Sequence, residues 1–178
     1  MRRSYLVGVA AALALPMLMT APAQANAPAA TVEVRGGDVL SPGHFIKNNL
    51  RFVPHSITVR SGDLVKWVDA DREQEPHTVT IANKSDLPQN IAQLNACFKR
   101  SGFCTQTLLA HDPGNDGIPP FHLVVNKGKP GLNQRGDSLA FADGLSHSVT
   151  HRVTAPAGTT LYYMCVIHPW MQGSIDVT

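Results

Sequence analysis

The residues best suited to chemistry lie close to the C-terminus, where Cys165, His168 and Met171 follow one another at intervals of three residues. Soft sulfur ligands together with imidazole suit copper, and two histidines, one cysteine and a weak axial methionine make a copper site that transfers electrons. Such a site needs a second histidine from elsewhere in the chain. His77 is the best candidate, because Pro76-His77 stands at the start of an expected strand. That strand follows the expected strand that contains Trp67.

Each of these residues also has an ordinary interpretation. A buried free cysteine is common, a lone histidine usually serves packing or the surface, and Met171 can fill a core. Taken singly, His77 and Met171 are better explained by packing. Taken as a set, the four side chains match the ligand types of one geometry, so the sequence predicts a copper site.

Short strand-like runs flank both parts of this set. Gly and Pro turns separate them at a spacing of roughly ten residues, which is typical of an antiparallel sandwich or barrel. The expected strands are residues 31–34, 52–60, 64–68, 78–82, 148–154, 159–164 and 173–177. The candidate ligands therefore lie at strand ends and in the loop between the last two strands of an all-β domain.

The segment 83–145 interrupts this pattern. Asp86 is expected to cap a helix that carries apolar residues at helical spacing and stops at Gly102. Those apolar residues are Ile91, Leu94 and Phe98. After the helix, Gly, Pro, Asn and Asp dominate the chain. A segment of this size with one helix can hardly bury a core of its own, so we expect an insertion within one domain that covers 26–178.

Both ends of this domain resemble cupredoxins, the blue type-1 copper proteins of the plastocyanin, amicyanin and pseudoazurin kind. The matching motifs are Phe52-x-Pro54-x-x-Ile57-Thr58-Val59-x-x-Gly62-Asp63-x-Val65-x-Trp67, then Pro76-His77, then Ala155-Pro156-Ala157-Gly158, and finally Tyr162-x-Met164-Cys165-x-x-His168-Pro169-x-Met171-x-Gly173-x-Ile175. The spacing of the last motif is more similar to amicyanin than to plastocyanin. The resemblance implies a Greek-key β-sandwich with a helix-containing insertion between its two halves.

The resemblance also implies a ligand set and a function. His77, Cys165 and His168 would be the equatorial ligands of one type-1 copper ion, and Met171 the axial ligand. Four protein ligands leave no open position for a substrate, so the protein would be an electron carrier and not an enzyme. In the family, electrons pass through the exposed edge of the C-terminal histidine, here His168. Transient redox partners are therefore expected to dock near His168 and Trp170.

The loop before His77 departs from the family pattern. It is longer, and Asp69 stands where the family usually has Asn. Asp69 can still accept a backbone N–H and brace the loop before His77. The loop also carries an acidic cluster, which consists of Asp69, Asp71, Glu73 and Glu75 and is interrupted by Arg72. This cluster has two interpretations, a solvated loop or a patch that steers a basic redox partner.

The remaining cysteines are Cys97 and Cys104. With Cys165 assigned to copper, these two form the natural disulfide, in a compartment that permits it. A second metal site that uses both thiols is the alternative, although no nearby histidine has a finger-like spacing. An accessory site built from other histidines is also conceivable, and the candidates are His147 and His151 with His111 or His122.

The first 25 residues are expected to be a secretory signal peptide. Arg2 and Arg3 precede an apolar run that ends at Ala23-Gln24-Ala25, a small-x-small cleavage pattern. A membrane anchor is the alternative, but the run is short and contains Pro16. We therefore expect an exported protein, periplasmic or secreted, with no membrane span in the mature chain. Without Arg2 and Arg3 the 15 basic residues fall to 13, equal to the 13 acidic residues, so no electrostatic footprint for nucleic acid remains.

Other copper functions have different sequence requirements. Copper nitrite reductases and multicopper oxidases add a catalytic copper between domains, and a histidine-brace oxygenase needs an N-terminal histidine. Copper-delivery proteins rely on methionine-rich sites, yet only Met164 and Met171 remain after removal of the leader. Copper binding or delivery, or a role as accessory subunit of a copper oxidoreductase, stays the alternative to an electron carrier.

Overall fold

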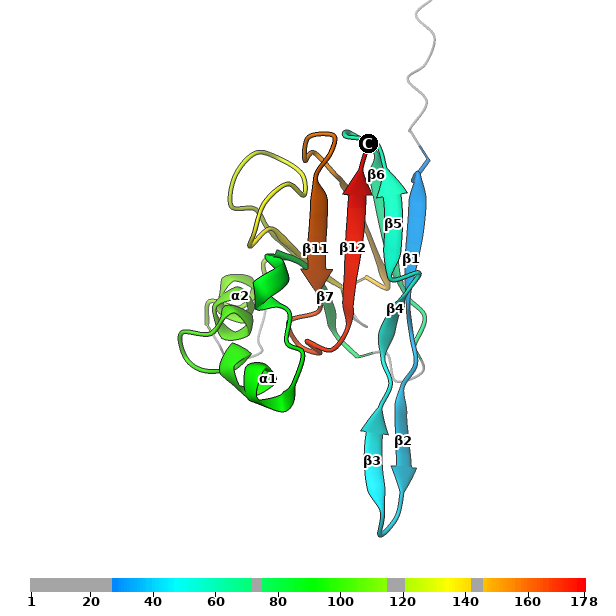
Figure 1. Cartoon of the computed structure of the whole chain (residues 1–178), viewed down its shortest axis with the longest axis vertical. Coiled ribbons are helices and arrows are strands. Elements are labelled where there is room, and N and C mark those ends of the chain that lie inside the picture. The colour runs from blue at the N-terminus through cyan, green and yellow to red at the C-terminus, as the bar shows by residue number, and fades with distance from the viewer. Residues whose placement is uncertain (1–26, 72–74, 115–120, 142–145) are drawn as a thin grey trace, which may run out of the picture.

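The computed structural model describes residues 27–71, 75–114, 121–141 and 146–178. Two β-sheets share one apolar core, and two helices lie beside the larger sheet (Figure 1). The smaller sheet has the order β10 (Ser148–Arg152), β6 (Leu64–Asp69), β1 (Ala30–Arg35) and β4 (Arg51–Val53). The larger sheet has the order β5 (Ser56–Val59), β12 (Gln172–Val177), β11 (Thr160–Met164), β7 (His77–Ala82), β9 (Ser138–Phe141) and β8 (Val124–Val125). The predicted β-sandwich with a helical insertion is confirmed.

Two strand pairs in this sandwich are parallel. Val32 of β1 lies opposite Trp67 of β6, and Ile175 of β12 lies opposite Ile57 of β5, both in parallel registers. The expectation of a purely antiparallel sandwich is therefore wrong at these pairs. Alternation of apolar and polar residues reports which face of a strand is buried, and it carries no information on the direction of the neighbouring strand.

The core of the sandwich is aromatic at its centre. Trp67 and Tyr163 are fully buried and meet edge to face, with ring centroids 6.2 Å apart. Phe52 from the smaller sheet packs on the same tyrosine at 5.0 Å. In β5 the burial alternates as the sequence pattern predicts, whereas all six residues of β7 are buried. Strand β7 is covered on both faces because the helices pack on its outer side.

The helical segment differs from the single helix that was expected. A short 3-10 helix, Lys84–Asp86, is followed by α1 (Ile91–Cys97) and α2 (Phe103–His111). The side chain of Asn90, not Asp86, caps α1 by accepting the N–H of Gln93. Gly102 precedes α2 instead of ending the fold's helical part. Helix α2 escaped prediction because its buried residues include polar ones; they are Cys104, Thr107 and His111.

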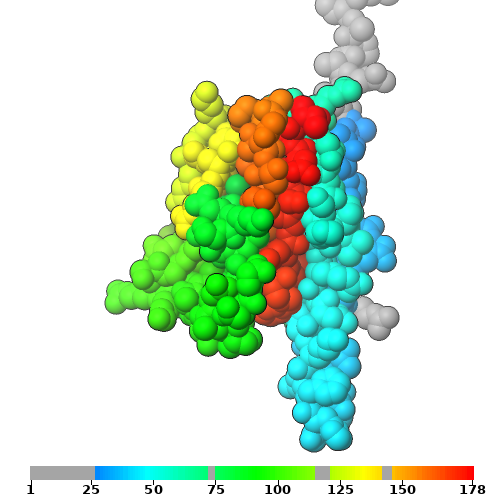
Figure 2. Space-filling model, viewed as in Figure 1, coloured from blue at the N-terminus to red at the C-terminus, as the bar shows by residue number. Residues whose placement is uncertain are grey.

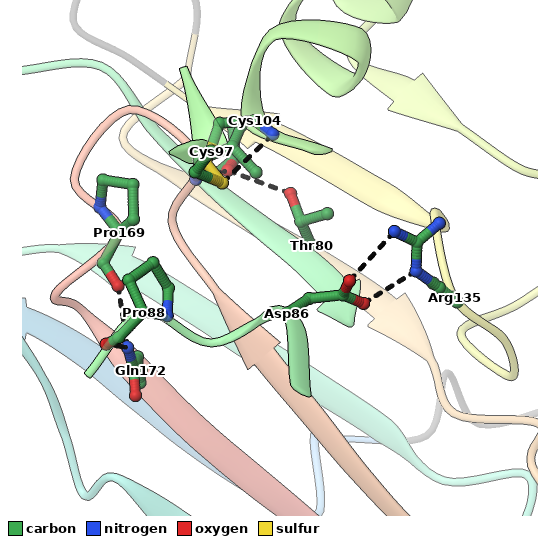
Figure 3. The surroundings of a disulfide bond; sticks show 10 residues. Thr80, Asp86, Pro88, Cys97, Cys104, Arg135, Pro169 and Gln172 are labelled. Atoms are coloured by element: carbon green, nitrogen blue, oxygen red, sulfur yellow. Dashed lines mark hydrogen bonds and ion pairs between the residues drawn. A yellow bond between two sulfur atoms is a disulfide. The ribbon is translucent and has the colours of Figure 1, made fainter. Parts of the chain in front are cut away.

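A disulfide joins the two helices. Cys97 ends α1 and Cys104 lies in the first turn of α2, with Cα atoms 5.0 Å apart, so the predicted pairing is confirmed. Figure 3 shows this bond, together with the N–H of Cys104 donating to Cys97 Sγ and the Asp86–Arg135 ion pair. These contacts bind the helical segment together beside β7.

A hairpin that the sequence did not indicate projects from the sandwich. It consists of β2 (Asp38–Ser41) and β3 (Phe45–Asn48), which form a separate two-stranded sheet extending beyond the larger one (Figures 1 and 2). Both of its faces carry exposed apolar side chains. Leu40 and Ile46 lie opposite each other on one face, and Val39 and Phe45 belong to the other.

The predicted signal peptide, 1–25, lies outside the described residues and stays a prediction. In the part of the chain that the structure describes, no helix combines the length and the apolar composition needed to cross a bilayer. The boundaries of the insertion, 83–145, also stay a prediction. Within them, strands β8 and β9 belong to the larger sheet of the sandwich.

Gly173 offers a test of this packing. A Cβ atom at Gly173 would lie 2.3 Å from Cζ of Tyr163 and 2.7 Å from the carbonyl oxygen of His55. Overpacking of this kind typically costs about 1–3 kcal/mol. We expect Gly173→Ala to lower the free energy of unfolding by that amount in urea titrations. Ser174→Ala, which removes only an exposed hydroxyl contact, is the control and should cost much less. Equal losses in the two variants would contradict the packing argument.

The disulfide offers a second test. Replacing both Cys97 and Cys104 by Ala removes a crosslink across a short loop. The chain-entropy model gives a loss of somewhat under ~3 kcal/mol for a loop of this length. Denaturant unfolding of the double variant should show that loss, and a thiol reductant should produce it in the parent protein. A parent protein whose unfolding midpoint ignores the reductant would contradict the prediction.

Candidate metal centre

Neighbouring strands of the larger sheet bring three potential ligands together. His77 is the first residue of β7, Cys165 directly follows β11, and His168 lies in the loop from β11 to β12. Because β7 and β11 pair antiparallel, the start of one meets the end of the other. Cys165 Sγ lies 4.0 Å from Nδ1 of His77 and 3.8 Å from Nδ1 of His168. The three side chains are buried, and their donor atoms lie within 4.8 Å of one another.

Backbone hydrogen bonds hold the loop from Cys165 to Met171, here called the ligand loop, in a tight turn. The N–H of Met171 donates to the carbonyl of His168, and the N–H of Cys165 donates to the carbonyl of Met171. The N–H of Thr78 donates to Cys165 Sγ at 3.3 Å. Met171 is fully buried and belongs to the same apolar cluster as Cys165. Its predicted role as axial ligand stays a prediction.

Gln172 ties this loop to the segment that leads into α1. Its Nε2 donates to the carbonyl oxygens of Pro169 and Pro88, at 2.9 and 2.8 Å (Figure 3). One side chain thus bridges the ligand loop and the residues before the helix. The loop geometry is therefore supported from outside the sandwich as well as from within it.

The electrostatics favour a thiolate. Burial alone would raise the pKa of the Cys165 thiol, but the hydrogen bonds and positive charge of His168 and His77 outweigh burial and lower that pKa to about 6. Burial likewise disfavours a charge on His77, yet its contacts with Cys165 and Asp71 raise the pKa of this imidazole. The thiolate is the form of cysteine that binds metals. The site therefore holds its sulfur ligand in the metal-binding form near neutral pH.

Carboxylates occupy the outer nitrogens of both histidines. Asp71 Oδ2 lies 2.7 Å from Nε2 of His77, with both side chains fully buried. Glu75 Oε2 lies 2.9 Å from Nε2 of His168. Asp69 Oδ1 accepts the N–H of Asp71 at 3.2 Å, which is the brace expected of Asp69. With the outer nitrogens engaged, the Nδ1 atoms of both rings are directed at Cys165.

These contacts change the interpretation of the acidic cluster. Asp71 and Glu75 act on the histidines and do not form a freely solvated loop, while Glu73 lies outside the described residues. The spacing of acidic residues gave no signal for this role, because only the folded loop brings each carboxylate to its ring. The second group with metal-binding potential among the described residues, Asp69, Asp71 and His77, shares His77 with the first.

The other metal hypotheses have different outcomes. Cys97 and Cys104 are joined to each other, so neither offers a thiolate. Within the described residues, no metal-compatible group contains His111, His122, His147 or His151. His111 instead contacts the His122 carbonyl and, through Nε2, the hydroxyl of Ser138 at 2.7 Å.

Trp170 forms the exposed rim of the site. Its ring lies 5.3 Å from that of His168, and 44% of Trp170 is exposed compared with 9% of His168. Its indole N–H donates to Oδ1 of Asn48 at the base of the hairpin. A groove runs from Trp170 and Gln172 to Ile91 and Leu94 of α1. The imidazole that the family resemblance places at the surface is thus nearly covered, while its tryptophan neighbour is accessible.

The donor set fits copper. One soft thiolate and two imidazoles converge in a buried space, with a buried methionine in the same loop. Sulfur suits the monovalent ion and imidazole the divalent one, so a mixed set serves both oxidation states.

Comparisons with known proteins find similar chains among solved structures. No family model matches the chain, and no curated protein matches it. Three similar solved structures are cupredoxins. The purple cupredoxin from Nitrosopumilus maritimus is 18% identical, with 84% of this chain and 99% of that chain covered and a TM-score of 0.38. Plastocyanin from Dryopteris crassirhizoma is 19% identical, with 83% and 99% covered and a TM-score of 0.40. The auracyanin from Roseiflexus castenholzii is 19% identical, with 86% and 99% covered and a TM-score of 0.43.

Proposed function

We propose that this chain is a type-1 copper protein that carries single electrons between redox partners outside the cytoplasm. One observation carries the proposal: Cys165, His77 and His168 direct their donor atoms at one buried point, and the two imidazoles hold the thiol in its thiolate form. A copper ion bound there would accept and release one electron. Met171 would complete the ligand set.

The chain's own residues would keep the site nearly unchanged during electron transfer. His77 begins β7, Cys165 directly follows the paired strand β11, and Asp71 and Glu75 fix the orientation of the two rings. Burial of the donors excludes water. Four protein ligands leave no position for a substrate, which supports an electron carrier over an enzyme.

A docking surface for redox partners would lie around His168 and Trp170. Trp170 is exposed, and it contacts Asn48 on the hairpin. By the two-residue period of a strand, Asn48 shares its hairpin face with Ile46 and its partner Leu40. An apolar surface of Trp170, Ile46 and Leu40 at the metal end of the molecule suits a small, transient contact.

Copper delivery, or a role as accessory subunit of a copper oxidoreductase, is the second candidate. Apart from Met164 and Met171, no methionine follows the predicted leader, which favours the electron carrier over a delivery protein. Export to the periplasm or the exterior is part of the proposal, because the disulfide between Cys97 and Cys104 suits an oxidising compartment.

The visible spectrum tests the proposal directly. Divalent copper added to the mature protein should give an intense thiolate-to-copper absorption band, and Cys165→Ala should abolish it. Met171→Leu should shift the band, because the axial ligand tunes such sites. Met164→Leu, at a buried methionine of the neighbouring strand, is the matched control and should leave the band in place. A tightly bound but colourless copper ion would refute the proposal.

Glu75 tests the role of the carboxylates. Its negative charge beside His168 favours the more positive oxidised site. We expect Glu75→Gln, which keeps the shape but removes the charge, to favour the reduced form about tenfold, a rise in reduction potential of about 59 mV for one electron. Asp176→Asn removes a carboxylate that accepts a hydrogen bond from Thr160 Oγ1 near the other end of β12, so it is the control. Equal potentials in the Glu75 variant and the parent protein would show that this charge does not act on the metal.

A further inference from the structure

A buried line of polar side chains connects helix α2 to the ligand loop. His111 Nε2 lies 2.7 Å from Ser138 Oγ, which lies 2.7 Å from Thr80 Oγ1. Thr80 Oγ1 lies 3.1 Å from Thr78 Oγ1, which accepts the N–H of Val166 at 2.9 Å. All four side chains are at most 6% exposed. We call these four residues the polar chain.

The strand geometry explains the alignment. Thr78 and Thr80 are two residues apart on β7, so both face away from the sandwich core, towards α2. Ser138 of β9 is the direct register partner of Thr80. Three hydroxyls therefore stand in a row under the end of α2, where His111 closes the row.

The two ends of the polar chain decide the direction of every hydrogen bond. His111 Nδ1 contacts the carbonyl oxygen of His122, which only accepts, so Nδ1 carries the proton. In the neutral ring Nε2 must then accept from Ser138. At the other end the N–H of Val166 only donates. Each hydroxyl in between consequently donates once towards His111 and accepts once from the side of Val166.

A neutral His111 is required by this order. A protonated ring would also donate from Nε2, so four protons would share the three contacts and one buried hydroxyl proton would have no acceptor within the polar chain. Burial lowers the pKa of His111, in agreement with a neutral ring. With a neutral His111, each hydroxyl of the polar chain donates one hydrogen bond and accepts one, so every member has its partners.

The last contact of the polar chain reaches the metal centre. Thr78 follows His77 in sequence, and Val166 follows Cys165. The hydroxyl of Thr78 therefore joins the backbones directly after two of the proposed ligands, while its own N–H donates to Cys165 Sγ. A shift of this hydroxyl would move the Cys165 side of the site relative to the His77 side.

We infer that His111 is a remote positioning residue for the metal centre, and that helix α2 sets the geometry at Cys165 through Ser138, Thr80 and Thr78. This inference rests on the proposed function for its consequence at copper. The mechanical part, the coupling of α2 to the Val166 amide, stands independently of any metal. The helical segment thereby becomes a support of the site.

Metal-free protein gives the first measurement, hydrogen exchange of the Val166 amide by NMR. Thr80→Val keeps the shape of the side chain and removes its hydroxyl, so exchange at Val166 should become about tenfold faster, as expected for the loss of a buried hydrogen bond. Thr80→Ser keeps the hydroxyl and should exchange close to the parent rate. His111→Phe should reproduce the effect of Thr80→Val, and the two changes combined should add little, because one break already interrupts the chain. His151→Phe, at a half-buried histidine of the opposite sheet, should leave Val166 exchange unchanged.

Copper-loaded protein gives the second measurement. Thr80→Val and His111→Phe should both shift the thiolate-to-copper band and the reduction potential in the same direction, while Thr80→Ser and His151→Phe should not. Unchanged Val166 exchange in Thr80→Val, or full additivity with His111→Phe, would overturn the inference. A parent protein without the copper band would refute the proposed function alone, because the exchange measurement still decides the coupling. If His111→Phe does not fold, the pair Thr80→Val and Thr80→Ser carries the test.

Discussion

The buried sulfur of Cys165 is the constraint on which the rest of the site depends. A thiolate without water is expensive unless charge and hydrogen bonds compensate it. Here two imidazoles face it at 4.0 and 3.8 Å, and the N–H of Thr78 donates to it. These three contacts come from β7 and from the ligand loop, so the thiolate is stable only while β7 and β11 keep their register. By holding these strands in register, the sandwich core keeps the imidazoles and the Thr78 N–H close to the Cys165 sulfur.

The imidazoles that stabilise the sulfur have stabilising partners of their own. The same imidazoles that stabilise the thiolate are themselves partly or fully buried, and each has a carboxylate on its outer nitrogen. The order from the sulfur outward is sulfur, imidazole and carboxylate, along two branches that both end in the loop before His77. Asp69 braces that loop through the backbone of Asp71. The segment before His77 supplies both carboxylates, so two of its acidic residues are explained by their contacts with the histidines.

The sequence predicted those parts of the structure that depend on local pattern. Period-two alternation located most strands, and the C-terminal motif contains Cys165 and His168, two of the three side chains that the fold brings together with His77. The sequence did not reveal the parallel strand pairs, because the alternation of apolar and polar residues carries no information on strand direction. Helix α2 escaped prediction because Thr107 and His111 lie on its buried side, where an amphipathic helix usually carries an apolar stripe. The contacts of Asp71 and Glu75 were also missed. The same acidic sequence is compatible with carboxylates that face water and with carboxylates that contact an imidazole.

The polar outer face of β7 explains why the helices have one position. An exposed strand could leave Thr78 and Thr80 to water, and an apolar one could be covered by a helix in many registers. Once α2 covers these hydroxyls, each needs a protein partner, since a buried unsatisfied group costs about 1–3 kcal/mol. The hydroxyls are satisfied in series, and the series ends on Nε2 of His111. A sliding helix would break the contact between His111 and Ser138 and leave the Ser138 hydroxyl without its acceptor. The Thr80 and Thr78 hydroxyls follow Ser138 in the series, so the polar face of β7 favours one position of α2.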